Sequence, residues 1–169
     1  MSEYQLKWLD DQRKATKWLG HPGADEGELA AAEQRLGVVL PPSLRNFLAA
    51  SNGFEKHIYG RVGSLYPVNR IEHFVESDEG YIADDWAEIQ ADEDIDDPDH
   101  PVALMRRALL LGGGDEDLLL LDPTSAEGAI HVFTVKYGEF ETFDSFEAFL
   151  DQADEDLERP AVDLPGTPG

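Results

Sequence analysis

The chain has 169 residues, with 36 Asp and Glu against 13 Lys and Arg, a formal net charge of −23 and no cysteine. The missing cysteine excludes disulfides, thiolate zinc sites and cysteine nucleophiles. The acidity argues against direct binding of nucleic acid or of an anionic membrane, because both carry negative phosphate groups. No apolar run approaches the roughly 20 residues of a membrane span, and the N-terminus has no secretory signal, so we expect a cytoplasmic protein.

The two ends of the chain differ from its middle. In the segment 1–24, the residues Leu6, Leu9 and Arg13 follow helical spacing, which predicts an N-terminal helical extension and leaves open whether it packs on the rest. We assign 25–152 to a single domain, which suits the length of the chain. The segment 153–169 combines acidic residues with prolines and glycines, so we predict an acidic, disordered tail there.

Two short helices are predicted at the start of the domain. Asp25 and Glu28 are typical of a capping pair, and they precede one apolar helix face that ends at Gly37. The pair Pro41 and Pro42 suits entry into a second helix, whose apolar residues follow the spacing i, i+3, i+4, i+7 over 44–51. The dipeptide Asn52-Gly53 is expected to stop this helix in the left-handed conformation.

Most of the charge excess lies in one segment. Arg70 and Arg106 bracket 35 residues that contain no Lys or Arg and hold 13 of the 36 acidic residues. A block of like charge is usually a solvated segment, and in other cases an interaction surface.

This acidic segment also contains apolar residues at a helical spacing. Ile82, Trp86 and Ile89 stand at i, i+4 and i+7, as one helix face requires. We therefore predict a helix over 82–91 that docks on the domain, followed by an acidic loop over 92–101.

Strand patterns dominate the remainder. Alternating or continuous apolar stretches predict strands at 57–59, 64–66, 108–111, 118–121, 130–135 and 139–142. The run Gly112-Gly113-Gly114-Asp115 predicts a hairpin turn, and Asp144 with Glu147 is typical of the start of a closing helix. The order predicts an α+β fold with two N-terminal helices, a central, mostly antiparallel sheet of about five or six strands, and a closing C-terminal helix.

No strong catalytic motif is present. The glycines at 112–114 precede acidic residues that would repel a phosphate, and neither an HExxH nor a GxSxG pattern occurs. Asp92, Asp94 and Asp96 match the first ligand positions of an EF-hand, but Asp97 and Ala103 stand where Gly and a bidentate Glu are required. We predict no catalytic residues, metal or cofactor; a hydrolase that uses an unmarked carboxylate pair is a third, less favoured hypothesis.

The ordered motifs resemble the SUKH superfamily, the Smi/Knr-like group. They are Glu33-Gln34-Arg35-Leu36-Gly37, Leu40-Pro41-Pro42-Ser43-Leu44-Arg45-Asn46-Phe47-Leu48, Asn52-Gly53, Leu65-Tyr66-Pro67-Val68, 111–122 and 143–150. The resemblance covers about 25–152 and is mostly structural. The motif residues that it implies are Leu40, Pro41, Phe47, Leu48, Asn52, Gly53, Gly113, Asp117 and Phe146, of which the apolar side chains are expected in the core. The long acidic segment and His131-Val132-Phe133-Thr134 depart from the family pattern.

The resemblance implies a non-enzymatic protein-binding domain. Many bacterial members look like immunity proteins that neutralise a cognate polymorphic toxin, often a nuclease, whereas some eukaryotic relatives are regulators. An acidic protein can bind at the basic cleft of a nuclease. The acidity has a second explanation of equal weight, which is that it serves only the solubility of the protein. The predicted partner is therefore a toxin domain, with an intracellular regulatory or scaffold role as the alternative, and the sequence leaves the oligomeric state undetermined.

The predicted contact surface is the acidic helix and loop. Its residues are Asp84, Asp85, Trp86, Glu88, Asp92, Asp94 and Asp96. Trp86 has two interpretations, as an apolar anchor for the partner, which binding hot spots favour, or as part of the core.

Overall fold

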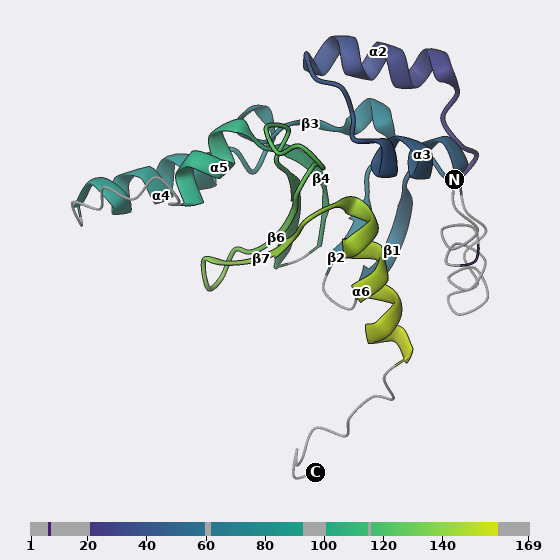
Figure 1. The fold of residues 1–169 in the computed structure, drawn as a ribbon. Helices are drawn as coiled ribbons and strands as arrows, with labels where there is room; N and C mark the ends of the chain where they lie inside the picture. The colour runs from purple at the N-terminus through teal and green to yellow at the C-terminus, as the bar shows by residue number, and fades with distance from the viewer. Residues whose placement is uncertain (1–6, 8–20, 60–61, 93–100, 115, 159–169) are drawn as a thin grey trace.

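The computed structural model describes residues 7, 21–59, 62–92, 101–114 and 116–158 (Figure 1). The helices are α2 (Glu26–Leu36), α3 (Pro42–Ala50), α4 (Tyr81–Asp92), α5 (Pro101–Arg107) and α6 (Phe146–Glu158), with short 3-10 turns η1 (Val68–Arg70) and η2 (Phe74–Glu76). The strands are β1 (Phe54–Tyr59), β2 (Val62–Leu65), β3 (Glu72–His73), β4 (Leu109–Gly113), β5 (Asp117–Leu121), β6 (Ile130–Thr134) and β7 (Glu139–Phe143).

The strands form one antiparallel sheet. Its order is β1-β2-β4-β5-β6-β7, and β3 pairs with the same edge of β4 as β2 does: β3 at the start of β4 and β2 at its end. The helices flank this sheet, so the predicted α+β class is confirmed. The structure adds the two-residue strand β3 and the helix α5, which begins at Pro101 where we predicted the end of a loop.

The sheet is buried on both faces. Along β5, Leu119 and Leu121 pack in one core with α2, α3 and α6, whereas Leu118 and Leu120 pack in a second core with α4 and α5. Successive strand residues point to opposite faces, so a strand covered on both sides is apolar throughout. Figure 1 shows the two helical groups on opposite sides of the sheet.

Local sequence determines the helix ends near the N-terminus. The Asp25 side chain accepts from the Glu28 backbone N–H at 2.9 Å, the Glu28 carboxylate accepts from the Asp25 N–H at 2.9 Å, and Gly37 closes α2 at φ 68°. These contacts satisfy the terminal backbone groups, as the capping pair predicted.

Several predicted boundaries require correction. Helix α3 ends at Ala50 with an extended Ser51 as its cap, so Asn52-Gly53 is not the helix stop; Gly53 adopts φ 81° two residues later, as the chain enters β1. Gly112 and Gly113 belong to β4, where they pair with Leu65 and Ser64, and the turn follows them.

The ends of the chain bear on two further predictions. Helix α6 continues to Glu158, past position 153, at which we predicted that the tail begins. The predicted N-terminal helix lies outside the described residues except for Lys7, and so does the remainder of the tail, 159–169.

Candidate partner-binding face

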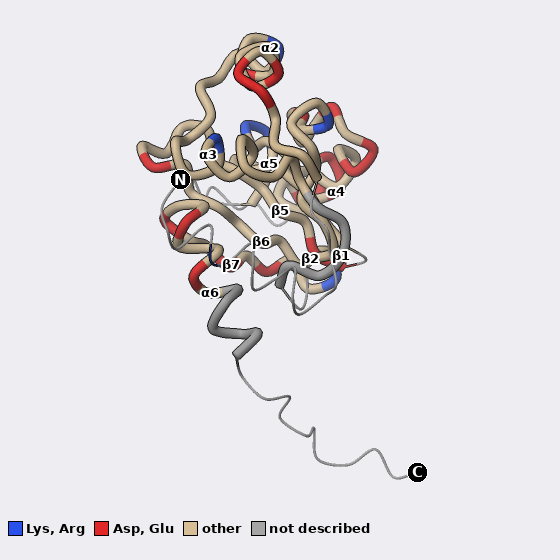
Figure 2. The backbone as a smooth tube through the Cα atoms, turned by 90° about the vertical axis from the view of Figure 1, so that its right-hand side faces the viewer, with Lys and Arg blue, Asp and Glu red and all other residues tan. Residues whose placement is uncertain are grey.

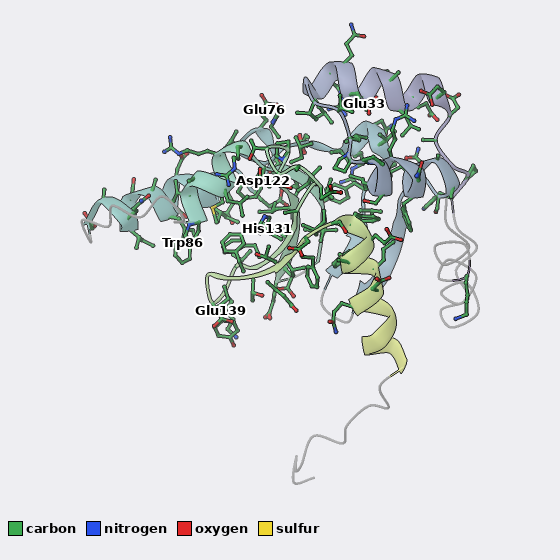
Figure 3. All side chains as sticks on the ribbon, in the orientation of Figure 1. Glu33, Glu76, Trp86, Asp122, His131 and Glu139 are labelled. Atoms are coloured by element: carbon green, nitrogen blue, oxygen red, sulfur yellow. The ribbon has the colours of Figure 1, made fainter. Side chains whose placement is uncertain are left out.

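Helix α4 is held to the sheet by one face. Ile82 and Ala83 are 5% and 2% exposed and belong to the second core. The half-buried indole of Trp86 meets Phe133 of β6 edge to face, with ring centroids 6.2 Å apart. Its ring edge also lies against Gly138 in the β6–β7 turn, and Figure 3 shows it pointing from α4 toward that hairpin. The inner face of α4 is therefore fixed by packing.

The opposite face of α4 carries the acidic residues. We define the acidic face as the exposed side chains Asp84, Asp85, Glu88 and Asp92. No Lys or Arg in the described parts of the chain forms an ion pair with any of these four carboxylates. Figure 2 shows the acidic positions on the backbone of α4. The negative field of this face is thus not neutralised by neighbouring described side chains.

Two apolar side chains are exposed on the same helix. Tyr81 is 61% and Ile89 is 45% exposed, which is high for large apolar groups. The nearby β6–β7 turn adds Tyr137, which is 65% exposed, and Glu139 follows it at the start of β7 (Figure 3). A charged face with a few exposed aromatic and aliphatic groups has the composition of a protein-binding surface, in which apolar anchors lie within a polar rim.

The structure brings together only part of the predicted contact surface. Asp84, Asp85, Glu88 and Asp92 share the outer side of α4, and Trp86 lies on the inner side against the sheet. Of the two interpretations of Trp86, the structure supports packing on the core, because the half-buried indole lies against the sheet. Asp94 and Asp96, with the rest of the predicted acidic loop, lie outside the described residues.

The predicted motif residues occupy the layer opposite α4. Leu40, Phe47, Leu48 and Phe146 are at most 1% exposed, and the rings of Phe47 and Phe146 meet edge to face at 5.3 Å. The Asn52 side-chain oxygen accepts from the Val68 N–H at 2.7 Å.

Three other motif residues have identifiable contacts. Pro41 lies beside Gly128, Gly113 accepts a hydrogen bond from the Ser64 hydroxyl at 3.1 Å, and the buried Asp117 carboxylate accepts from the Thr134 hydroxyl. These contacts place Pro41, Gly113 and Asp117 in structural roles.

A match to a family model shows which family the chain belongs to. The SMI1 / KNR4 family (SUKH-1) matches residues 23–152. The chain belongs to this family. The match confirms the SUKH resemblance drawn from the motifs. No curated protein matches the chain.

Sequence reasoning missed a polar cluster of this SUKH-1 domain that centres on the buried Asp122. Asp122, 7% exposed, accepts from Arg107 of α5 through both carboxylate oxygens: Oδ2 from Nη2 at 2.9 Å and from Nε at 3.1 Å, and Oδ1 from Nε at 3.2 Å. It also accepts from the Thr124 N–H at 2.9 Å. The Asp-x-Thr spacing is a local signal of this turn, but only the fold places Arg107 beside it. His131 lies nearby, and burial lowers the pKa of its imidazole, with a smaller opposing influence from Asp122.

The SUKH-1 domain has no cluster of His, Asp and Glu suited to a metal ion among its described residues. None of the helices in the described ranges is both long and apolar enough to cross a membrane.

Proposed function

We propose that this SUKH-1 domain is a non-enzymatic immunity protein that binds and neutralises a cognate toxin through the acidic face of α4. The observation that carries the proposal is the combination of four exposed carboxylates on the outer side of α4, which pair with no Lys or Arg of the described ranges, with exposed Tyr81 and Ile89. The family match supports the immunity role, because many bacterial members of this family resemble immunity proteins.

The charge of the face indicates the chemistry of the partner. A surface on which all charges are negative attracts a positively charged partner, and this electrostatic attraction mainly raises the association rate. A nuclease toxin has to present a basic cleft to its substrate, since nucleic-acid binding depends on Lys and Arg. We therefore propose a toxin domain with a basic surface, such as a nuclease, as the partner.

The rigidity of α4 also favours binding. The buried residues Ile82 and Ala83, with Trp86 against Phe133, hold the helix on the sheet before a partner arrives. A preformed face loses little conformational freedom on binding, so more of the interaction energy appears as affinity.

The experiment is co-purification with the toxin-like product of the adjacent reading frame, followed by binding measurements at several salt concentrations. The test variant carries Asp84→Asn, Asp85→Asn, Glu88→Gln and Asp92→Asn. The control carries the same number of neutralised charges at four exposed positions away from α4, which are Glu127→Gln, Asp144→Asn, Glu147→Gln and Asp151→Asn.

We expect the test variant to lose about tenfold or more in affinity, mostly in the association rate, and to show a weaker salt dependence. The control variant should bind nearly as the wild type does. Equal losses in both variants would show that only net charge matters, and no loss in either would place the interface elsewhere. Capture of a housekeeping enzyme or cytoskeletal protein from the native cell, in place of a toxin, would favour the regulatory alternative.

A further inference from the structure

A cavity of about 460 Å³ opens on the side of the molecule that carries α2 and α3. It lies where the start of α2, the end of α3 and the end of β2 meet. Its lining includes Glu28, Asn52, Ser64, Leu65, Tyr66 and Arg70. This volume is within the range of small-ligand sites, and none of its lining residues belongs to the acidic face of α4.

Hydrogen bonds hold the walls of the cavity in place. The Asn52 N–H donates to the Pro22 carbonyl at 3.2 Å, and the Asn52 side-chain oxygen accepts from the Val68 N–H. The Tyr66 N–H donates to the Leu111 carbonyl at 2.7 Å, and the Ser64 hydroxyl donates to the Gly113 carbonyl. The parts of the lining around Asn52 and Tyr66 are thus tied to the sheet and to neighbouring loops, so these walls are in place before any ligand binds.

Arg70 is the group with unused binding capacity. Its guanidinium carbon lies 4.2 Å from the centroid of the Tyr66 ring, a cation–π arrangement that holds the guanidinium in place. Arg45 and Arg107 are paired with carboxylates, whereas Arg70 forms no ion pair with any described carboxylate. In a chain with a net charge of −23, an arginine at the wall of a cavity that pairs with none of the described carboxylates can serve an external anion.

Two neighbouring groups add hydrogen-bond donors. Burial, with added negative charge from Glu79 and Glu72 and against a smaller opposing influence of Arg70, raises the pKa of the Tyr66 hydroxyl, so this group keeps its proton at neutral pH and can donate. The side-chain oxygen of Asn52 is already used by the Val68 N–H, which leaves the Asn52 amide nitrogen as the donor of that side chain.

Glu28 selects among anions. Its carboxylate is held by the Asp25 N–H, at 2.9 Å, and contributes a negative charge to the lining. A phosphate dianion would be repelled more strongly by this charge than a singly charged carboxylate would be. A guanidinium also matches the planar, two-oxygen geometry of a carboxylate.

We propose that the cavity is a binding site for a carboxylate group, held by the guanidinium of Arg70 with the Tyr66 hydroxyl as a second donor. The carboxylate belongs to a small organic acid or to the C-terminus of a peptide. This site is separate from the proposed toxin-binding face, and it does not depend on the proposed function.

The experiment titrates the full chain with matched probes and follows the backbone amide signals of residues 64–66 and 68–70 by NMR. The probes are N-acetyl-Ala-Leu with a free C-terminal carboxylate, the same peptide with a C-terminal amide, propionate and inorganic phosphate. The variants are Arg70→Gln and Tyr66→Phe. Arg106→Gln is the control, because Arg106 is an exposed arginine at the end of α5 and does not line the cavity.

We expect the free-acid peptide to shift these amide signals, with the amide peptide and the Arg70→Gln variant each at least about tenfold weaker. Tyr66→Phe should weaken binding by a smaller factor, and Arg106→Gln should bind as the wild type does. Propionate binding as tightly as the peptide would assign the site to small acids, and binding of the peptide alone would assign it to a chain terminus.

Three results would overturn the proposal. They are equal binding of acid and amide, tighter binding of phosphate than of either carboxylate, and the absence of shifts with every probe up to about 10 mM. Thermal unfolding of each variant verifies that the fold is retained, and the exposed position of Arg70 predicts that it is.

Discussion

The indole ring of Trp86 lies directly against Gly138, so that a side chain at Gly138 would overlap it. Gly138 is in the β6–β7 turn, 52 positions away along the chain. This contact, with the packing of Trp86 on Phe133, fixes how α4 sits on the sheet and therefore which way its acidic residues face.

Replacement of Gly138 by alanine tests this contact. Gly138 and Gly37 both adopt a left-handed conformation, with φ 66° and 68°, but a Cβ at Gly37 would meet no atom within 4 Å. We expect Gly37→Ala to lower the free energy of unfolding by about 1 kcal/mol through backbone strain alone. Gly138→Ala should lower it by about 1–3 kcal/mol more, because the methyl group displaces the indole. Urea unfolding measures both, and equal losses would show that Trp86 does not press on Gly138.

Replacement of Glu88 by lysine tests whether the acidic face opposes stability. Glu88 is four residues from both Asp84 and Asp92 on α4, and like charges at this spacing repel. We expect Glu88→Lys to raise the free energy of unfolding by about 0.5–1 kcal/mol and to weaken toxin binding. Glu127→Lys makes the same charge change at an exposed turn and should leave stability nearly unchanged. A stabilisation of equal size in the control would attribute the gain to net charge.

The pair of Asp122 and Arg107 predicts acid sensitivity. Burial raises the pKa of Asp122, but hydrogen bonds from Arg107 and Thr124 outweigh it and lower the pKa to about 2 from 3.8. The carboxylate is thus favoured by folding; its stabilisation is present above pH 3.8 and is lost as the pH falls toward about 2.

We expect Asp122→Asn to lower the free energy of unfolding at neutral pH by about 1–3 kcal/mol. The difference from the wild type should shrink in urea titrations toward about pH 2. Asp144→Asn, at an exposed position, is the control and should unfold as the wild type does. If the difference in the free energy of unfolding between Asp122→Asn and the wild type stays the same at about pH 2, the negative charge of Asp122 is not its cause.

His131 predicts a second pH dependence, in a higher range. Its Nε2 is buried and has no hydrogen-bond partner among the described residues, and its Nδ1 lies 2.9 Å from the Thr142 hydroxyl. Burial lowers the pKa of His131 from 6.5, with an opposing influence from Asp122 and a reinforcing one from Arg107. Since the folded state disfavours the protonated form, stability should fall as the pH drops below 6.5.

Replacement of His131 by phenylalanine should remove this part of the pH dependence between about pH 7.5 and about pH 5. His21→Gln, at an exposed position, should retain it. Urea midpoints across this range measure the slope, and a His131→Phe variant as acid-sensitive as the wild type would assign the slope to other groups.

Local patterns predicted many of the elements. The capping pair of Asp25 and Glu28 and the left-handed Gly37 bound α2, because each acts on backbone groups within one turn of itself. The leucines of β5 predicted a buried strand, since only a strand covered on both faces is apolar at every position. Helix α5 was missed, although Pro101 at its first position is a local signal of a helix start.

The candidate sites were less predictable. The spacing of Ile82, Trp86 and Ile89 predicted the helix, but only two of these residues turn toward the sheet, and Ile89 is exposed. The cavity was not predicted, because its lining comes from separate parts of the chain, within 21–28, at Asn52 and within 64–70, that have no common motif.

By itself, the sequence determined most of the secondary-structure elements, the family and the large excess of negative charge, since these depend on residues close together or on composition. Tertiary structure alone decided that the carboxylates of α4 point outward while Trp86 points inward, that Arg107 reaches Asp122, and that Arg70 meets Tyr66 at the wall of a cavity. These relationships depend on how distant segments pack on the two faces of one sheet, and the packing is set by the burial of the whole core rather than by any local pattern.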